Sequence, residues 1–429
     1  MLSSLQKSWL ILHKNNQSLR FSADREGIVF IQMKDKAPII LNDQLWERLL
    51  ELTNGAAALC YQCGSCTATC PWGAVRNEPL LVRTFIRQAQ IGVHDGDDNL
   101  WLCTTCAQCQ AYCPRGVDIP KIFLALRSIA WEQRRVQKGL PSVLWSEYWN
   151  NNPWSQPPSQ RSLWAKYLEI PTFNPDQHEI LLYIGCTSSF DRRAQKIAKA
   201  LINLLRAAGV PFGFLGDDEP CCGEAVLSVG HLPYFQEIAQ QTLQVFHDRG
   251  VTKLVTISPH CYDVFKNHYP SIVGQDVILP THYTQYLVQL FQEGRLKFAH
   301  PPLTLDTGSR DTLRVTFQDP CYLGRRNGEY EAPRSLLAAI PGIELVEMRD
   351  SGADGLCCGG GGGRMWLETP SGERFSDLRT RQAAETGASL LATACPFCLV
   401  CLEDSLKAAR IKTMQIMDVA EIVALAIGK

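Results

Sequence analysis

The sequence of 429 residues lacks several features that would assign it to a familiar class. No segment approaches the roughly 18 consecutive apolar residues of a membrane-spanning helix. The apolar run at residues 9–12 is too short for a secretory signal, and no cleavage site follows it. No Gly-x-Gly-x-x-Gly fingerprint follows an apolar strand, so we expect neither flavin nor nucleotide to bind this chain.

An excess of charge of one sign is also missing. Lys and Arg total 42 against 43 Asp and Glu, which gives a net charge of −1. This balance excludes a global attraction to nucleic acid or to anionic membranes. We expect a cytoplasmic protein in a reducing compartment, peripheral on the inner membrane only where a partner subunit holds it there.

Cysteine, by contrast, is abundant, with 18 residues. Eight of them form two copies of the run Cys-x2-Cys-x2-Cys-x3-Cys-Pro, which binds [4Fe–4S] cubanes in bacterial two-cluster ferredoxins. In such runs the first three cysteines bind one cluster and the fourth binds the other. The first expected ligand set is therefore Cys60, Cys63, Cys66 and Cys113. The second is Cys103, Cys106, Cys109 and Cys70. Structural zinc, the alternative for Cys-x2-Cys pairs, does not normally use three cysteines in one loop.

The segments around these motifs are expected to be helical. Apolar residues at helical spacing predict helices over 79–90 and 119–135. The motifs would then lie in an all-helical two-cluster domain, residues 51–136. Alternating residues within 17–41 predict a small β element in the N-terminal segment 1–50.

Residues 137–177 differ from their surroundings in composition. They contain four Trp and six Pro among many polar residues. A Pro-rich polar segment is typical of a linker, but tryptophans are rarely solvated in one. We expect a linker that packs against the domains it joins, and the alternative is an exposed docking surface.

The rest of the chain repeats one pattern, which predicts two α/β units with parallel sheets, residues 178–300 and 312–429. In each unit strands and helices alternate, and cysteines follow the ends of strands, where sites of parallel sheets gather. The second unit has five such cysteines: Cys321, Cys357, Cys358, Cys395 and Cys398. The first unit has four: Cys186, Cys221, Cys222 and Cys261. Ser258 stands where the second unit has Cys395.

A single cysteine, a Cys-Cys-Gly pair and a Cys-x2-Cys pair, in this order, resemble the cysteine-rich (CCG) domain of heterodisulfide reductase catalytic subunits. Fusion to a helical ferredoxin domain is similar to their D-type subunit and to iron–sulfur subunits of glycolate and lactate oxidases. The resemblance covers residues 55–429. It implies that the five cysteines of the second unit bind a noncubane [4Fe–4S] cluster and are catalytic in disulfide reduction. The first unit departs from the pattern at Ser258, so its cysteines hold an ordinary four-thiolate cluster or none.

Other residues near these cysteines have two interpretations each. Arg325, Arg326 and Arg364 either neutralise a cluster or face solvent, or they clamp an anionic thiol substrate. His260 is a hydrogen-bonded structural histidine or, alternatively, a proton donor or ligand. We expect Cys401 to be a buried helix residue and not a ligand.

Two functions are compatible with these observations. In the first, the chain is an oxidoreductase subunit that passes electrons through two cubanes to or from a noncubane cluster that reduces a disulfide. In the second, it is a non-catalytic conduit between a flavoprotein dehydrogenase and a quinone or membrane partner. Both require a flavoprotein or a membrane electron-transfer subunit as partner. The complete second cysteine set favours the first function, and Ser258 weakens it.

Overall fold

The structure is a computed structural model that describes residues 43–93, 98–273, 278–298, 312–370 and 372–428, together with three N-terminal strands. These strands, β1 (Ile11–Lys14), β2 (Gln17–Ala23) and β3 (Val29–Met33), form an antiparallel sheet. They lie in the segment where alternating residues predict a β element.

A helical domain follows the N-terminal segment and carries both ferredoxin-type cysteine runs. Its longer helices are α1 (Asp43–Thr53), α4 (Val82–Gln90) and α6 (Ile119–Glu132). One-turn helices hold the cysteine runs: α2 (Ser65–Ala68), α3 (Trp72–Val75) and α5 (Gln108–Ala111). Helix α6 begins at a cap in which the Asp118 side chain accepts a hydrogen bond from the Lys121 amide. Most of its residues are buried because other elements cover it on all sides.

The rest of the chain forms the two expected α/β units, each around a four-stranded parallel sheet. The first sheet has the order β5-β4-β6-β7 and the second the order β9-β8-β10-β11. These orders are equivalent, so the internal repeat and the multidomain α and α/β fold are confirmed. The strands of the first sheet are β4 (Ile180–Tyr183), β5 (Phe212–Gly213), β6 (Lys253–Thr256) and β7 (Leu279–His282). Those of the second are β8 (Leu313–Gln318), β9 (Ile343–Leu345), β10 (Leu390–Thr393) and β11 (Gln415–Asp418).

Helices connect the strands of each unit. The first unit has α8 (Cys186–Phe190), α9 (Gln195–Ala207), α10 (Glu224–Ser228), α11 (Leu232–Asp248), α12 (Pro259–Asp263), α13 (Pro270–Val273) and α14 (Tyr283–Gln292). The second has α15 (Glu331–Ala339), α16 (Phe375–Glu385), α17 (Pro396–Ala408) and α18 (Val419–Ala426). The fourth strand and final helix of each unit follow its last cysteine and did not emerge from the sequence pattern.

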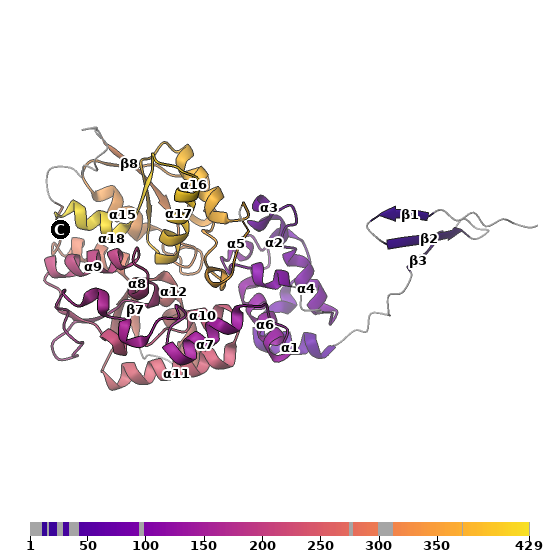
Figure 1. Ribbon diagram of the computed structural model, residues 1–429, viewed down its shortest axis with the longest axis horizontal. Helices are drawn as coiled ribbons and strands as arrows, with labels where there is room; N and C mark the ends of the chain where they lie inside the picture. The colour runs from indigo at the N-terminus through magenta and orange to yellow at the C-terminus, as the bar shows by residue number, and fades with distance from the viewer. Residues whose placement is uncertain are drawn as a thin grey trace, which may run out of the picture.

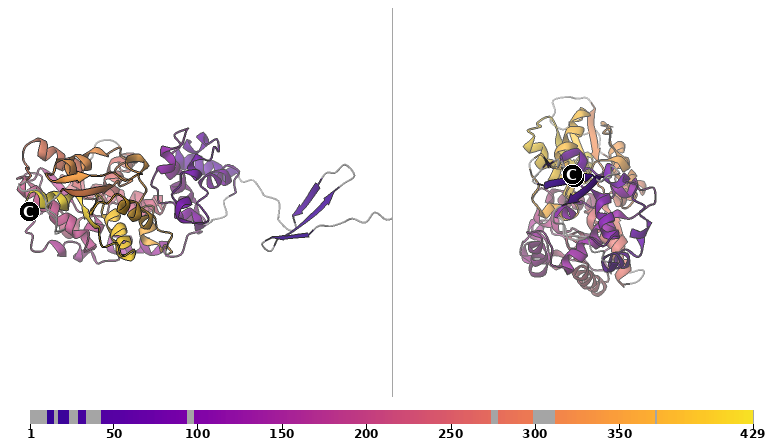
Figure 2. Two further views of the ribbon diagram at one scale, coloured as in Figure 1. Left: turned by 90° about the horizontal axis from the view of Figure 1, so that it is seen from above. Right: turned by 90° about the vertical axis from the view of Figure 1, so that its right-hand side faces the viewer.

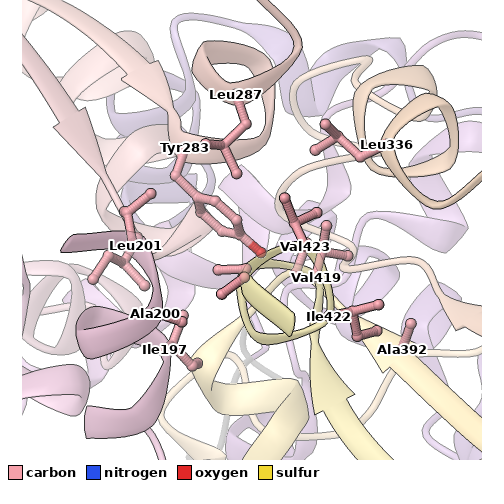
Figure 3. Close-up of a cluster of buried hydrophobic side chains, with 14 of the residues drawn as sticks. Ile197, Ala200, Leu201, Tyr283, Leu287, Leu336, Ala392, Val419, Ile422 and Val423 are labelled. Carbon is pink, nitrogen blue, oxygen red and sulfur yellow. The ribbon is translucent and has the colours of Figure 1, made fainter. Parts of the chain in front are cut away.

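The two units share one hydrophobic core. Helix α9 packs against α18, and α14 packs against α15, so helices of one unit contact helices of the other. Figure 3 shows side chains of α9, α14 and α18 converging, with Tyr283 among them. The Tyr283 hydroxyl donates a hydrogen bond to Asp418 Oδ1 at 2.5 Å, which joins the units by a buried polar contact. The helical domain lies at one end of this pair, and the second unit (orange and yellow) lies beside the first (Figures 1 and 2).

The Trp-rich segment 137–177 begins with helix α7 (Leu140–Asn150). Trp154 packs edge-on against Trp366 of the second unit, with ring centroids 5.2 Å apart, and Trp164 packs against the shared core. Trp145 and Trp149 are instead 61% and 70% exposed. The expected packing therefore holds for two of the four tryptophans, and the other two lie on an open face of α7.

Candidate iron–sulfur sites

The two ferredoxin-type loops have the same backbone conformation. Gln62 and Thr105, one residue before the second cysteine of each run, have φ of 67° and 52°. Gly64 and Ala107, one residue after it, have φ of 91° and 61°. Left-handed backbone is costly for residues other than glycine, and it is found where a binding loop requires it. The shared conformation curls both loops around their cysteines, as ligand loops for one kind of group would require.

The first expected ligand set meets in space. Its four cysteines line one cavity together with Gly64 and Arg83: Cys60, Cys63, Cys66 and Cys113. Cys63 is the one exposed cysteine of the eighteen, all of which lie in described parts of the chain. Across the described residues, no three Cys, His, Asp or Glu side chains close on a position for a single metal ion. A donor set of four thiols around a shared space fits a multinuclear cluster.

The second expected set is deeper in the protein and lies against the second α/β unit. Burial and the neighbouring thiols Cys103, Cys106 and Cys70 raise the pKa of Cys109 well above its usual value. Burial also raises the pKa of Cys103 to about 11, although the charge of Arg127 opposes this. The four members therefore lie close enough to influence one another. Deprotonation of such buried thiols requires a compensating positive charge, which iron supplies when a cluster binds.

The five cysteines of the second unit also lie together, at the carboxyl ends of its strands. The Cys321 and Cys357 sulfurs are 3.9 Å apart, and those of Cys358 and Cys398 are 3.3 Å apart. Cys395 precedes α17 and hydrogen-bonds to Cys398. The Gly359 amide donates to the Cys357 sulfur at 3.2 Å. The φ of Gly359 is 91°, a left-handed conformation that would strain a residue with a side chain. All five are buried.

His260, from the first unit, reaches into this second-unit cluster of cysteines. Its ring stacks on Tyr322 with centroids 3.8 Å apart, and its Nδ1 is 3.1 Å from Glu224 Oε1. Burial alone would lower the pKa of His260, but the charge of Glu224 and a hydrogen bond with Cys395 raise it to about 10. Burial would likewise raise the pKa of Cys395, but hydrogen bonds from Cys398 and His260 lower it. His260 is therefore buried and hydrogen-bonded, in agreement with its structural interpretation, and its contact with Cys395 lowers the pKa of a candidate ligand.

The second ferredoxin-type loop touches the cysteine-rich site directly. The Cys106 and Cys357 thiols are hydrogen-bonded, and this contact together with burial raises the pKa of Cys106 well above its usual value. The Thr104 hydroxyl is 3.9 Å from the Cys357 sulfur. Five consecutive glycines, residues 359–363, follow Cys358 and also abut this loop, since a Cβ on Gly362 would lie 2.2 Å from the Cys103 carbonyl oxygen. The ligand set of the second ferredoxin-type loop therefore lies directly beside the five-cysteine set of the second unit.

The first unit has a similar cysteine pocket without a fifth thiol. Its four cysteines and Ser258 line one cavity, and the Cys222 and Cys261 sulfurs are 3.3 Å apart. Ser258 caps α12 by accepting a hydrogen bond from the His260 amide. The Trp-rich segment contributes buried polar side chains here. Arg161 donates to the Cys186 sulfur at 3.3 Å, and the Cys221 thiol donates to Glu147 at 3.2 Å.

The arginines singled out from the sequence have different environments. Arg325 donates to the Cys106, Ala353 and Gly355 carbonyls, so it fastens the ferredoxin-type loop to the second unit. Arg326 pairs with Asp263, with 3.0 Å between Nε and Oδ2. Arg364 is buried beside a cavity that Cys358 and Cys401 line. Cys401 is half-buried, so the expectation that it is buried is only partly right.

Arg127, which no sequence motif marks, is completely buried in α6. Its guanidinium donates to carbonyl oxygens of three separate segments: Leu100 and Cys103 of the helical domain, Ser228 of the first unit and Gly362 of the second. No carboxylate within the described ranges forms an ion pair with it. A lone arginine inside a helix carries no sequence signal for such a position.

Comparison with known protein families agrees with this geometry. The family model described as "Cysteine-rich domain" (CCG) matches residues 180–266 and 315–403, and the "4Fe-4S dicluster domain" model matches 56–117. The chain belongs to the CCG family of iron–sulfur oxidoreductases, heterodisulfide reductase D-like. The matched ranges fall within the α/β units and the helical domain, whose limits remain predictions.

Several curated proteins are similar to this CCG-family chain. The probable iron–sulfur-binding oxidoreductase FadF of Bacillus subtilis is 36% identical over 76% of this chain and 46% of its own length. The EtfAB:quinone oxidoreductase of Syntrophomonas wolfei is 35% identical over the same shares. The D-type heterodisulfide reductase polypeptide of Methanosarcina barkeri is 28% identical over 86% of this chain and 93% of that protein. The chain thus spans about half the length of the first two relatives. Within the described residues, no helix has the length and apolar character needed to cross a membrane.

Substitution of Gly362 tests the contact between the loops. In Gly362→Ala, the new Cβ would overlap the Cys103 carbonyl, so we expect the cysteine loops to move apart and unfolding to begin at lower denaturant concentration. Gly372→Ala is the matched control, because φ of Gly372 is also positive, at 86°, but nothing lies within 4 Å of its Cβ position. Equal losses of stability in the two variants would show that only backbone strain matters at Gly362.

Proposed function

We propose that this chain is the iron–sulfur subunit of an oxidoreductase, in which electrons pass between two cubanes of the helical domain and a noncubane cluster on the second unit. The contact between Cys106 and Cys357 carries this proposal. It would put a ligand of the second cubane beside a ligand of the noncubane cluster. The clusters, when bound, supply one-electron transfer.

The exposure of the three cysteine sets supports one order of transfer. Cys63 of the first set is exposed, the second set is buried or half-buried, and the five cysteines of the second unit are all buried. A partner at the surface would therefore exchange electrons with the first cubane. The noncubane cluster of the second unit would be the buried end of the electron-transfer path.

A disulfide is the substrate that we propose for this buried end. Its cleavage takes up two electrons and two protons and gives two thiols, so one-electron carriers must deliver twice. A cavity of about 450 Å³ lies beside Cys358 and Gly359, within the range of small-molecule sites. Arg364, Thr369 and Ser376 line it and could orient a polar substrate.

The conduit function remains a second candidate, and the first unit favours it. Ser258 occupies the position of a fifth ligand there, so this half of the repeat has no complete set for sulfur chemistry. One similar protein is named as a quinone oxidoreductase, not as a disulfide reductase. The conduit would carry electrons between a flavoprotein and a quinone-reducing partner.

Substitution of Cys358 tests the cluster arrangement in the intact chain. We expect the anaerobically purified wild type to contain about 12 iron and 12 acid-labile sulfide, and Cys358→Ala to lose about four of each. The paramagnetic signal of the C-terminal cluster should disappear while both cubanes stay reducible. Cys401→Ala is the control, since this half-buried thiol is outside the proposed set. Stoichiometric zinc without sulfide, or loss of all clusters in Cys358→Ala, would contradict the proposal.

A further inference from the structure

The surface around Cys63 differs from the rest of the helical domain. Cys63 is exposed, and the Tyr61 side chain hydrogen-bonds to its thiol. Tyr61 lines the cavity that holds this cysteine. Four apolar side chains of this part of the chain are exposed, each between 45% and 59%: Leu59, Tyr61, Leu81 and Tyr112. Each adjoins, or belongs to, a cysteine run or the start of α4. This set with Cys63 is called the Cys63 surface below.

Three arginines give the Cys63 surface a positive charge. Arg83 and Arg115 line the cavity itself, and Arg87 is exposed one turn after Arg83 on α4. The Arg83 guanidinium lies over Gly64, because a Cβ there would be 3.4 Å from Arg83 Nη1. None of the three forms an ion pair with a residue in the described ranges. The nearby Asp354 carboxylate instead accepts a hydrogen bond from Tyr112.

We propose that the Cys63 surface is the docking site of an acidic one-electron carrier protein. The proposal rests on the function proposed above and specifies where electrons cross the surface. Apolar contacts around an exposed ligand bring a partner close, and a positive rim steers a negatively charged one. Transient redox complexes use small interfaces of this kind, with total buried areas below about 1,200 Å².

A charge-reversal experiment on the cluster-loaded full chain tests this surface. Reduced flavodoxin, a small acidic protein, serves as electron donor, and stopped-flow absorbance follows cluster reduction. We expect Arg83→Glu/Arg115→Glu to lower the second-order rate constant at least about tenfold at low ionic strength. The salt dependence of the rate should also become weaker or reverse. Basic cytochrome c, used as oxidant of the reduced chain, should react faster with this variant.

The control is Lys196→Glu/Lys199→Glu on α9, where both lysines are exposed and the change in net charge is the same. Helix α9 lies at the far end of the molecule from the helical domain (Figure 1). We expect this variant to retain the wild-type rate within about twofold, since distant charges are screened. An equal slowing of both variants would overturn the proposal, because net charge alone would then explain it.

Two further measurements separate docking from other roles. Photoreduced deazariboflavin, a small uncharged donor, and redox titration measure how far Arg83→Glu/Arg115→Glu changes the first cubane itself, because both arginines line its cavity. The rate with flavodoxin should fall by more than these two measurements explain. A shift in potential that accounts for the slower rate would assign the arginines to cluster tuning and overturn the docking site. A wild type that binds no cluster would refute the proposed function itself, whereas clusters that any donor reduces without regard to charge would refute the Cys63 surface alone.

Discussion

Cys395→Ser should abolish disulfide reduction by the intact complex while Ser258→Ala leaves the rate within about twofold of wild type. The first substitution turns the second unit into a copy of the first, and a serine hydroxyl is a far poorer ligand for iron than a thiolate. It also removes the thiolate that His260 stabilises. Turnover of a disulfide substrate, with iron content measured for each variant, is the deciding assay.

The comparison with Ser258 makes this prediction specific. Ser258 caps a short helix, and Ala there removes one hydrogen bond to the His260 amide, a loss of about 1 kcal/mol of stability. If Ser258→Ala is as harmful as Cys395→Ser while the other clusters remain intact, sulfur chemistry takes place in the first unit. Wild-type turnover by Cys395→Ser would show that Cys395 is not needed for disulfide reduction, and a fully loaded wild type without disulfide turnover would favour the conduit function.

Arg127→Met should destabilise the protein by about 3 kcal/mol or more, which is the second large effect that we expect. The change leaves carbonyl oxygens of three segments, including Cys103 and Gly362, buried without donors. It also removes a buried positive charge near Cys103, so the reduction potential of the adjacent cubane should fall. Denaturant unfolding gives the stability, and redox titration followed by paramagnetic resonance gives the potential.

Two further variants calibrate the effect of Arg127. Arg127→Lys keeps the charge but has no planar fork of donors, so we expect intermediate stability and a nearly wild-type potential. Arg135→Met removes an exposed arginine just beyond α6 and should change neither quantity. Wild-type stability in Arg127→Met would mean that water replaces the guanidinium at this junction.

The sequence predicted the elements that carry a strong local pattern. Helices α4 and α6 lie where apolar residues at helical spacing predicted helices, over 79–90 and 119–135. Strands β7 and β11 were missed because neither is a continuous apolar run: β7 contains a proline and a histidine, and β11 begins with a glutamine and ends with an aspartate. The sequence pattern of one unit also does not reveal that the last helix of that unit packs against the other unit.

The candidate sites could be predicted as sets but not as neighbours. Cysteine spacing groups the ligands because each loop is local, and the structure brings the expected sets together. The contact of Cys106 with Cys357 joins residues far apart in sequence, so only the tertiary fold reveals it. The buried position of Arg127 and the contact of His260 with the second unit also depend on the tertiary fold. The residue types give no hint of them, because arginine is usually exposed and histidine has many ordinary roles.

The shared core of the two units has a consequence for how duplicated halves diverge. Helices α9 and α14 of the first half cover α18 and α15 of the second, and His260 of the first half completes the surroundings of Cys395. The half with the incomplete cysteine set therefore cannot be discarded, because its partner would lose both a wall of its core and a side chain at its site. Selection can relax on the ligand position at Ser258 while it still preserves the whole fold of that half. The first unit is thus retained because the second unit needs it in order to fold and to surround Cys395.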